Sequence, residues 1–345
     1  MTGHTGFKGS WLSLWLEKLG AEVTGIALNP ETTPNHWTLL NLPIDDRRID
    51  IRQADAVMKV FTEKQPEIVF HLAAQPLVRR SYRDPLETWT TNIVGTASLL
   101  EACRKTPTVR AIVVITTDKC YENQEWSWGY RESDRLGGYD PYSASKAASE
   151  LVAASYRRSF FGSNNSPLLA TARAGNVIGG GDWSEDRLIP DLIRALDEGR
   201  SLEVRSPGAT RPWQHALEPL TGYLLLGQKL LAGEREFADA WNFGPDAEGN
   251  RTVADVLGRV AKSWPRVMWH MTDKPQPHEA TLLYLDSAKA LNMLGWKPVW
   301  QLDAALAATV DWYRAWLDSH QLLTLQQLDH YIETAKRTNA YWTCK

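Results

Sequence analysis

The chain of 345 residues contains few cysteines, no long apolar run and no marked excess of charge of one sign. Its three cysteines, Cys103, Cys120 and Cys344, are odd in number and widely spaced, which argues against a disulfide framework. There is no run of about 18 apolar residues and no signal-peptide pattern, so we expect a cytoplasmic protein without a membrane partner. A net charge of −3 gives no reason to expect nucleic acid as a partner.

Metal ligands are sparse as well. The eight histidines show no ligand spacing, so we expect no metal site.

The chain does contain 43% apolar and 23% charged residues, which suffices for a substantial core in one large or two modest domains. Any anionic substrate would have to be held by local arginines.

Three glycines near the start, Gly3, Gly6 and Gly9, are spaced G-x-x-G-x-x-G. Apolar residues follow at helical spacing over 11–19, and a strand is expected over 23–28. Glycines let the backbone turn sharply and approach a pyrophosphate, whose charge meets the helix N-terminus. The alternative is a flexible loop before an amphipathic helix.

Such a loop should follow a buried central strand, yet only Met1 precedes Thr2. A sheet without that strand would leave the neighbouring strand edges unpaired. We therefore expect the first strand to be missing from this chain. Our hypothesis is that the true start lies upstream and that Met1 replaces an internal valine whose GTG codon was read as an initiator. An in-frame stop codon immediately before Met1 would reject it.

Asn29 and Asp50 are two polar residues that could contact a bound dinucleotide. An acidic residue at the end of the second strand usually holds the adenosine ribose of NAD, and here Asn29 takes that place. No arginine follows closely to clamp a 2′-phosphate, so we expect NAD rather than NADP. Asp50, before a helix near 53–63, either caps that helix or binds the adenine amino group.

Strands and helices alternate in the first half, which predicts a doubly wound parallel α/β sheet. A strand over 68–72 ends in the small residues 73–76, at the edge where cofactors dock in such sheets. A helix over 85–105 carries Asn92 in an otherwise apolar stripe. The strand over 111–116 then delivers Thr117, Asp118 and Lys119.

Tyr142 and Lys146 are four residues apart, so on a helix they share one face. A cation beside a phenol favours the phenolate and lowers the pKa of the tyrosine. This arrangement suits removal of a proton from an alcohol while hydride leaves its carbon. Asp118 alone would suggest a cap or turn and Lys119 a solvated side chain, but their place one loop before Tyr142 favours a catalytic role.

The alternation loosens at a glycine-rich connector over 175–183. We therefore predict an NAD-binding domain over 1–174, to which later segments may return, and a smaller mixed α/β substrate domain over 175–345. Arginine forks fit phosphate oxygens, and Arg211, in Arg-Pro-Trp-Gln-His, is the best phosphate candidate in its loops.

These motifs together resemble the extended short-chain dehydrogenase/reductase superfamily. Within it the chain is similar to the nucleotide-sugar 4,6-dehydratases, most closely to those that act on CDP-glucose, from Thr2 to about residue 316. The resemblance rests on residues 117–121, 125–132, 137–142, 173–183 and 211–215. The run 117–142 is the most specific, because other 4,6-dehydratases usually have Glu in place of Lys119.

The resemblance implies a Rossmann-type fold, bound NAD and a reaction in two parts. Tyr142, with Lys146 and the Thr117 hydroxyl, would take the proton of the sugar 4-hydroxyl during oxidation at carbon 4. Asp118 as acid and Lys119 as base would then remove water across carbons 5 and 6. A lysine base needs a lowered pKa, through burial or a nearby cation such as Lys146.

The resemblance also assigns binding residues. The implied cofactor contacts are Gly3, Thr5, Gly6, Phe7, Gly9, Asn29, Asp50, Ile51, Leu72, Ala73, Ala74, Gln75, Asn92, Thr116, Tyr142, Lys146 and Arg173. The implied nucleotide-sugar contacts are Asn176, Arg187, Leu188, Ile189, Arg211 and His278, with a surface turn as the alternative for His278. The family further implies a homodimer or homotetramer, with the helices over 85–105 and 141–161 as a dimer bundle, and a role in 3,6-dideoxyhexoses of lipopolysaccharide O-antigen.

Two other readings remain open. A nucleotide-sugar 4-epimerase or decarboxylase would use the same fold, but epimerases need no acid/base pair such as Asp118 and Lys119. A non-catalytic NAD-binding protein would not need the intact set of Thr117, Tyr142 and Lys146.

Overall fold

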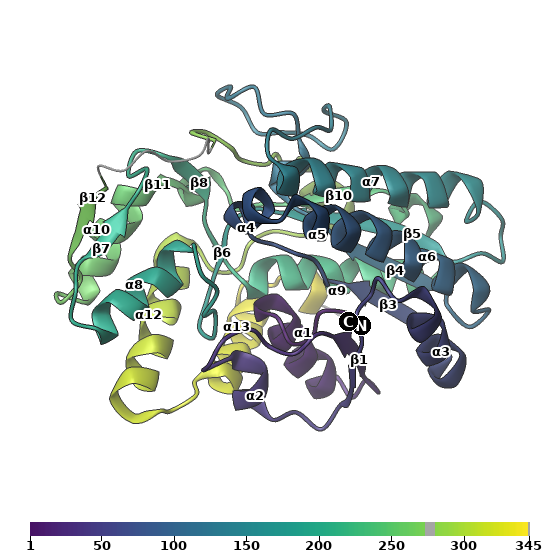
Figure 1. Ribbon diagram of the computed structural model, residues 1–345, viewed down its shortest axis with the longest axis horizontal. Coiled ribbons are helices and arrows are strands. Elements are labelled where there is room, and N and C mark those ends of the chain that lie inside the picture. Colours follow the sequence, from purple (N-terminus) through teal and green to yellow (C-terminus); the bar gives the residue numbers. More distant parts are fainter. Residues whose placement is uncertain (273–279, 344–345) are drawn as a thin grey trace.

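Six parallel strands form the central sheet in the described part of this computed structural model, which comprises residues 1–272 and 280–343 (Figure 1). The strands are β1 (Thr24–Ala27), β2 (Asp45–Arg48), β3 (Ile68–His71), β4 (Ala111–Ile115), β5 (Leu168–Ala174) and β10 (Ala240–Phe243). Their spatial order is β2-β1, then Thr2, then β3-β4-β5-β10. The prediction of a doubly wound parallel sheet is confirmed.

Thr2 occupies the place of the central strand. It forms β-bridges to both Ile26 and His71, and its backbone N–H donates to Phe70 O at 2.9 Å. The next amide, of Gly3, donates to Ile26 O at 2.8 Å. The described residues form no regular strand here, as expected, but the neighbouring strands are not left without a partner at this level. The hypothesis of an upstream start stays a hypothesis.

Helices cover both faces of the sheet because its side chains alternate in direction. Val113 and Ile115 point to the face covered by α1 (Phe7–Lys18), α9 (Leu217–Leu231) and α13 (Thr324–Arg337). Ile112 and Val114 point to the face covered by α3 (Ala54–Lys64), α6 (Gly95–Lys105) and α7 (Pro141–Ser159). Figure 1 shows α7 and α6 on one side of the strands and α9 and α1 on the other.

The helix predicted over 85–105 is continuous but not uniform. It consists of α5 (Pro85–Trp89), a π-helical turn over Thr90–Val94, and α6. Asn92 lies in that turn and is buried. Single π-turns inside helices recur at functional sites.

A second core lies at the left of Figure 1, beside the sheet. It packs α8 (Leu188–Asp197), α10 (Val253–Ser263) and α12 (Leu302–Ser319) against short ladders. The ladders pair β6 (Val177–Ile178) with β9 (Gln214–His215), β7 (Leu202–Val204) with β12 (Trp269–Met271), and β8 (Thr210–Pro212) with β11 (Asn250–Thr252). The remaining helices are α2 (His36–Leu40), α4 (Val78–Arg83) and α11 (Ala288–Leu294).

Residues after 175 also complete the first sheet, since they supply β10 and α9. The boundary at residue 174 stays a prediction. The apolar run over 282–285 predicts a further short strand, which is not observed: Leu282 and Leu285 form only isolated bridges, to Thr210 and Tyr130. None of the described helices is long and apolar enough to cross a membrane.

Candidate active site

One cleft of about 900 Å³ runs along the carboxyl ends of the parallel strands. It extends from the loop after β1, past the ends of β3 and β4, to the segment before α8 and the end of β7. Ligands bind at this edge in open α/β sheets. Eighteen of the twenty predicted catalytic and cofactor residues line this cleft.

Taken residue by residue, every predicted site residue in the described part of the chain lines this cleft, except Asn92 and Arg173. His278 lies outside the described residues. The predicted residues therefore come from many separate segments of the chain, and the fold places them around one cavity. Their roles are not decided by position alone and stay predictions.

The glycine loop has the shape that a dinucleotide pyrophosphate requires. Gly3 has φ +74°, and a Cβ there would lie 2.6 Å from the Ala73 nitrogen. A Cβ on Gly9 would lie 1.9 Å from Gly3 O, whereas one on Gly6 would meet only Gly3 O at 3.4 Å. Gly3 and Gly9 are thus needed by the fold, and Gly6 keeps open the space before α1, where free helix N–H groups attract an anion. The residues present fit NAD.

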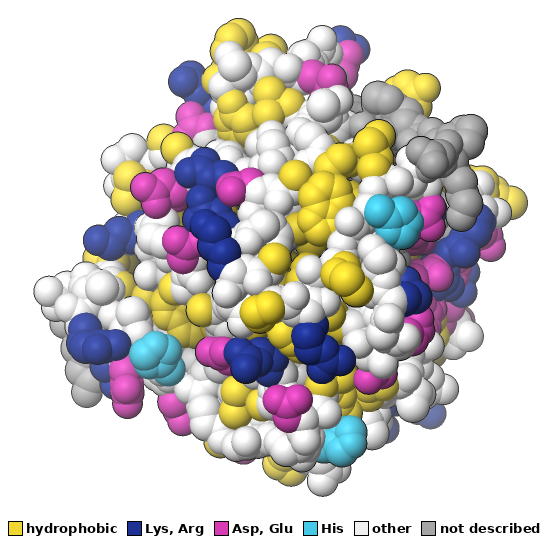
Figure 2. All heavy atoms as spheres, turned by 90° about the vertical axis from the view of Figure 1, so that its left-hand side faces the viewer, with side chains coloured by type: hydrophobic (Ala, Val, Ile, Leu, Met, Phe, Trp, Pro, Cys, Tyr) yellow, Lys and Arg dark blue, Asp and Glu magenta, His cyan; other side chains and the backbone are white. Residues whose placement is uncertain are grey.

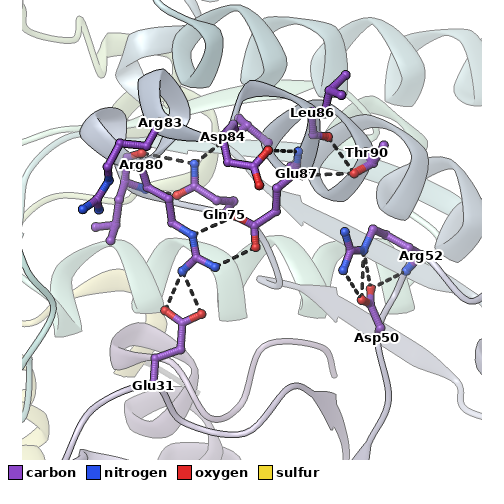
Figure 3. A network of polar contacts seen from close by, with 12 residues as sticks. Glu31, Asp50, Arg52, Gln75, Arg80, Arg83, Asp84, Leu86, Glu87 and Thr90 are labelled. Carbon is purple, nitrogen blue, oxygen red and sulfur yellow. Dashed lines mark hydrogen bonds and ion pairs between the residues drawn. The ribbon is translucent and has the colours of Figure 1, made fainter.

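The adenosine end of the cleft is rich in ion pairs (Figure 3). The Asp50 carboxylate accepts hydrogen bonds from the backbone N–H and the guanidinium of Arg52, and α3 begins at Ala54 without a side-chain cap. Asp50 therefore does not cap that helix, which leaves the adenine contact as its predicted role. Asn29 is exposed at the cleft.

Helix α4 carries three arginines that contact carboxylates on other segments. Arg80 Nη1 donates to both oxygens of Glu31 at 2.7 Å, and its other edge binds Glu87 (Figure 3). Arg79 lies 3.5 Å from Asp186, and Arg83 pairs with Glu185. The helix thereby joins the loop after β1 to the loop before α8 across the mouth of the cleft.

Tyr142 and Lys146 sit in the first turns of α7. Asp140 caps this helix by accepting from the Ser143 N–H at 2.9 Å, and Pro141 occupies its first position. Lys146 Nζ donates to Ile115 O at 3.1 Å, at the end of β4. The helix cap and the strand end thus fix the two side chains in the cleft.

The electrostatics of this pair differ from the expectation. Burial raises the pKa of Tyr142 above its ordinary value, opposed by a hydrogen bond with Thr117 and by the charge of Arg187. Burial lowers the pKa of Lys146 to about 8, with Glu150 the main opposing charge. Burial is thus the main influence on the pKa of Tyr142 in the protein without a ligand. The pKa is raised, whereas the sequence analysis expected Lys146 to lower it.

Asp118 is fully buried within a one-turn 3₁₀ helix over Asp118–Cys120 that follows β4. The Thr117 hydroxyl donates to Asp118 Oδ1 at 2.8 Å, and Lys119 Nζ lies 4.0 Å from the same oxygen. Asp118 Oδ2 has no hydrogen-bond partner within the described residues. A buried carboxylate oxygen at a cleft wall is suited to hold a hydroxyl of a bound ligand.

A contact that could not be predicted lies opposite this turn. A Cβ on Gly175 would lie 3.0 Å from Asp118 Oδ2 and 2.4 Å from Pro212 Cγ. Glycine at this position is therefore required for the Asp118 carboxylate and β8 to approach each other.

Lys8 is a site residue that the sequence analysis missed. Its Nζ lies 3.2 Å from the Tyr223 hydroxyl, inside the cleft. Burial, together with the charges of Lys146 and Arg187, lowers its pKa to about 7, and Asp118 opposes this. The only signal was its position between the glycines of the loop, where a charged side chain is forced close to the ligand.

The far end of the cleft presents arginines. Arg187 Nη1 binds Asp182 at 2.8 Å immediately before α8, and Leu188 and Ile189 form the first turn of that helix. Arg211 is buried in β8, and Asn176 lies beside it on the cleft wall. Guanidinium groups and free helix N–H groups suit a diphosphate. On the face shown in Figure 2, by contrast, Lys/Arg and Asp/Glu side chains are intermingled.

Asn92 and Arg173 lie behind the cleft rather than in it. Asn92 Nδ2 donates to Gln75 O at 3.1 Å and to Ser145 Oγ at 2.8 Å. Arg173 is buried against Glu150 and Tyr121. Each side chain is held by protein groups that support the cleft wall, and the predicted cofactor contact of both residues stays a prediction. The described residues contain no cluster of potential metal ligands.

Comparison with known proteins shows which family the chain resembles. The family model described as GDP-mannose 4,6 dehydratase matches residues 1–309. CDP-glucose 4,6-dehydratase of Salmonella typhimurium is 45% identical over 346 residues, covering 98% of this chain and 96% of that protein. The dTDP-glucose 4,6-dehydratase of the same organism is 27% identical, covering 91% and 92%.

Solved structures give the same result for the fold. UDP-glucose 4-epimerase of Thermus thermophilus in complex with NAD superimposes with a TM-score of 0.79 at 25% identity, covering 91% of this chain and 97% of that one. The dTDP-glucose 4,6-dehydratase of Streptomyces venezuelae, solved with NAD, gives a TM-score of 0.76 at 25% identity, covering 91% and 95%. The chain belongs to the GDP-mannose 4,6-dehydratase family.

Proposed function

We propose that this protein catalyses the NAD-dependent dehydration of CDP-glucose to CDP-4-keto-6-deoxyglucose. The observation that carries the proposal is the turn that places Asp118 and Lys119 next to Tyr142, joined through the Thr117 hydroxyl. The 45% identity to a CDP-glucose 4,6-dehydratase supports CDP as the nucleotide. The two NAD complexes among its structural relatives support the cofactor.

NAD bound against the glycine loop supplies a hydride acceptor for carbon 4 and a hydride donor for carbon 6. Tyr142 in its phenolate form takes the proton of the sugar 4-hydroxyl, and the Thr117 hydroxyl, which lies between Asp118 and Tyr142, holds the phenolate oxygen in place. Lys146 is anchored on Ile115 O and keeps positive charge beside this group. Burial of all three excludes water from the oxidation.

Water loss requires a second acid and base on the other side of the sugar ring. Asp118 lines the cleft, and its Oδ2 has no hydrogen-bond partner among the described residues; in its protonated form it donates a proton to the departing 6-hydroxyl. Lys119, partly exposed beside it, removes the proton at carbon 5, which the 4-ketone has acidified. Arg187, Arg211 and the first turn of α8 hold the diphosphate.

A 4-epimerase is the second candidate, because an epimerase shares this fold at a TM-score of 0.79. An epimerase returns hydride to carbon 4 and has no use for a buried acid next to Thr117 whose second oxygen lacks a partner among the described residues. The position of Asp118 therefore favours dehydration, and the same argument applies against a decarboxylase. A non-catalytic NAD-binding protein would not require the Tyr142 and Lys146 geometry.

The test is a substrate panel of CDP-, dTDP- and GDP-glucose, incubated with the full chain and NAD. We expect a 4-keto-6-deoxy product from CDP-glucose, with solvent deuterium at carbon 5 and no net release of NADH. Formation of CDP-galactose would establish epimerisation instead. Turnover of dTDP-glucose in preference to CDP-glucose would refute the assigned nucleotide.

The proposal extends to assembly, location and pathway. Exposed apolar residues on the paired helices α5–α6 and α7, namely Leu86, Val94, Leu151 and Phe160, support a homodimer bundle or a homotetramer built from it. Light scattering after size-exclusion chromatography tests this. A cytoplasmic location and a role in 3,6-dideoxyhexoses of lipopolysaccharide O-antigen complete the proposal.

A further inference from the structure

A buried ion pair lies directly behind the catalytic residues and is not used by the chemistry above. Glu150 on α7 and Arg173 on β5 are each 3% exposed, and Glu150 Oε2 accepts from Arg173 Nη2 at 2.9 Å. Taking two charges out of water is costly unless other hydrogen bonds satisfy them. The partners of this pair therefore show what it holds in place.

The carboxylate end of the pair holds the start of the catalytic turn. Glu150 Oε1 accepts a hydrogen bond from the Thr116 hydroxyl, and Oε2 accepts one from Thr171 at 2.7 Å. Thr116 is the residue between Ile115, which anchors Lys146, and Thr117. Glu150 thereby fixes the strand end from which the turn departs.

The guanidinium end holds the other side of the same turn. Arg173 Nη1 donates to the Tyr121 hydroxyl at 2.7 Å, and the guanidinium stacks 4.9 Å from the centre of the Tyr121 ring. The Tyr121 hydroxyl in turn donates to Asn242 Oδ1 at 2.7 Å, on β10. Tyr121 directly follows the 3₁₀ turn that carries Asp118 and Lys119.

Glu150 also shares a helix face with Tyr142 and Lys146. Tyr142, Lys146 and Glu150 are successively four residues apart on α7 and lie one turn above another. Among the titratable groups around Lys146, Cys120 and His71 are held neutral by burial, which raises the pKa of the thiol and lowers the pKa of the imidazole to about 3. Lys8 is either cationic or neutral. Of Cys120, His71, Lys8 and Glu150, it is therefore Glu150 that carries a negative charge.

We propose that Glu150 and Arg173 are positioning residues for both parts of the reaction: their ion pair clamps both ends of the Thr117–Cys120 turn and holds a carboxylate one helical turn from Lys146. The inference rests on the proposed function for its catalytic consequence. Its structural and electrostatic consequences can be measured without turnover.

The first experiment titrates Lys146 by competitive acylation of lysine amines across pH, followed by peptide mass spectrometry. In Glu150→Gln the midpoint of Lys146 should move to lower pH by about one unit, because an opposing charge has been removed. Asp239→Asn is the matched control, since it removes a carboxylate paired with Arg157 on α7 away from the turn. Equal midpoints in Glu150→Gln and the wild type would overturn the inference.

The second experiment keeps the ion pair and loosens only the turn, and it covers the case in which Glu150→Gln fails to fold. Tyr121→Phe removes the hydroxyl that joins Arg173 to Asn242. In stopped-flow absorbance with CDP-glucose, enzyme-bound NADH should form at the wild-type rate and decay roughly tenfold more slowly, because the loss of one aligned hydrogen bond misplaces Asp118 and Lys119.

Wild-type decay kinetics in Tyr121→Phe would contradict the clamp. Failure of the wild-type enzyme itself to form the deoxy product would refute the proposed function, and the Lys146 titration would still decide the inference. A purely structural role of the pair would lower thermal stability without shifting that titration.

Discussion

Helix α7 and the turn over Asp118–Cys120 meet at the same point in the cleft but are built in opposite ways. The helix has nineteen residues, a side-chain cap at Asp140 and a periodic buried face, so Tyr142 and Lys146 are placed by local structure. The turn has three residues and gains its position from distant segments, through Glu150, Arg173 and Gly175. We therefore expect Tyr142 and Lys146 to tolerate distant substitutions that displace Asp118 and Lys119.

The largest effect should come from the helix. Tyr142→Phe removes the group that accepts the 4-hydroxyl proton, and we expect NADH formation in a single turnover to fall by about three orders of magnitude or more. Tyr139→Phe is the matched control, since Tyr139 is 79% exposed and lies three residues earlier. NADH formation near the wild-type rate in Tyr142→Phe would mean that another group accepts the proton.

A change in the turn should separate the two steps. Asp118→Asn keeps the shape of the side chain but removes the acid, so we expect water loss to slow by about two orders of magnitude while oxidation at carbon 4 stays within a few-fold. Stopped-flow NADH absorbance and deuterium exchange at carbon 5 report the two steps. Equal slowing of both would place Asp118 in the oxidation instead.

A smaller change tests how closely the turn depends on its surroundings. In Gly175→Ala the added methyl group would meet Pro212 and Asp118 Oδ2, so one of them must move. We expect water loss to slow roughly tenfold and the protein to lose about 1–3 kcal/mol of unfolding free energy from overpacking. Gly258→Ala is the control, because a Cβ there meets nothing within 4 Å and should leave turnover unchanged.

The smallest effect on turnover is expected from a comparison of two buried carboxylates, which differ in how they respond to pH. Arg173 holds the pKa of Glu150 below its ordinary value. Glu218 on α9 accepts hydrogen bonds from two backbone N–H groups and the Tyr331 hydroxyl, and burial raises its pKa to about 7.

 

For Glu218 the sign follows from its folded pKa being above the unfolded value of 4.5. The folded protein holds the proton more tightly, so this group stabilises the fold fully below about pH 4.5 and loses that contribution as pH rises through about 7. The slope is about 1.4 kcal/mol for each pH unit within that window. Chemical denaturation at pH 5 to 8 should therefore show a steeper fall in wild type than in Glu218→Gln; parallel curves would contradict this origin.

The sequence predicted the structure correctly where the position of an element or side chain depends on the residues next to it. Alternation of strands and helices predicted the parallel sheet, and the four-residue spacing predicted the shared face of Tyr142 and Lys146. The G-x-x-G-x-x-G spacing predicted the loop, in which Gly3 and Gly9 are sterically required.

The sequence did not predict which way a side chain points when its partners come from distant segments. Arg173 and Asn92 were expected at the cofactor, but β5 and the π-turn direct them to protein partners behind the cleft. Lys8 was overlooked because its burial depends on Tyr223, more than two hundred residues away. The strand expected over 282–285 has the right composition, but its residues form isolated bridges instead of a ladder.

The arginines of α4 have a consequence for how the protein responds to its medium. Arg79 and Arg83 join the two walls of the cleft through ion pairs that water and dissolved ions can reach. Such contacts weaken as ionic strength rises, whereas a pair sealed between α7 and β5 is shielded from the same ions. Added salt should thus ease passage through the entrance and leave the catalytic geometry behind it intact.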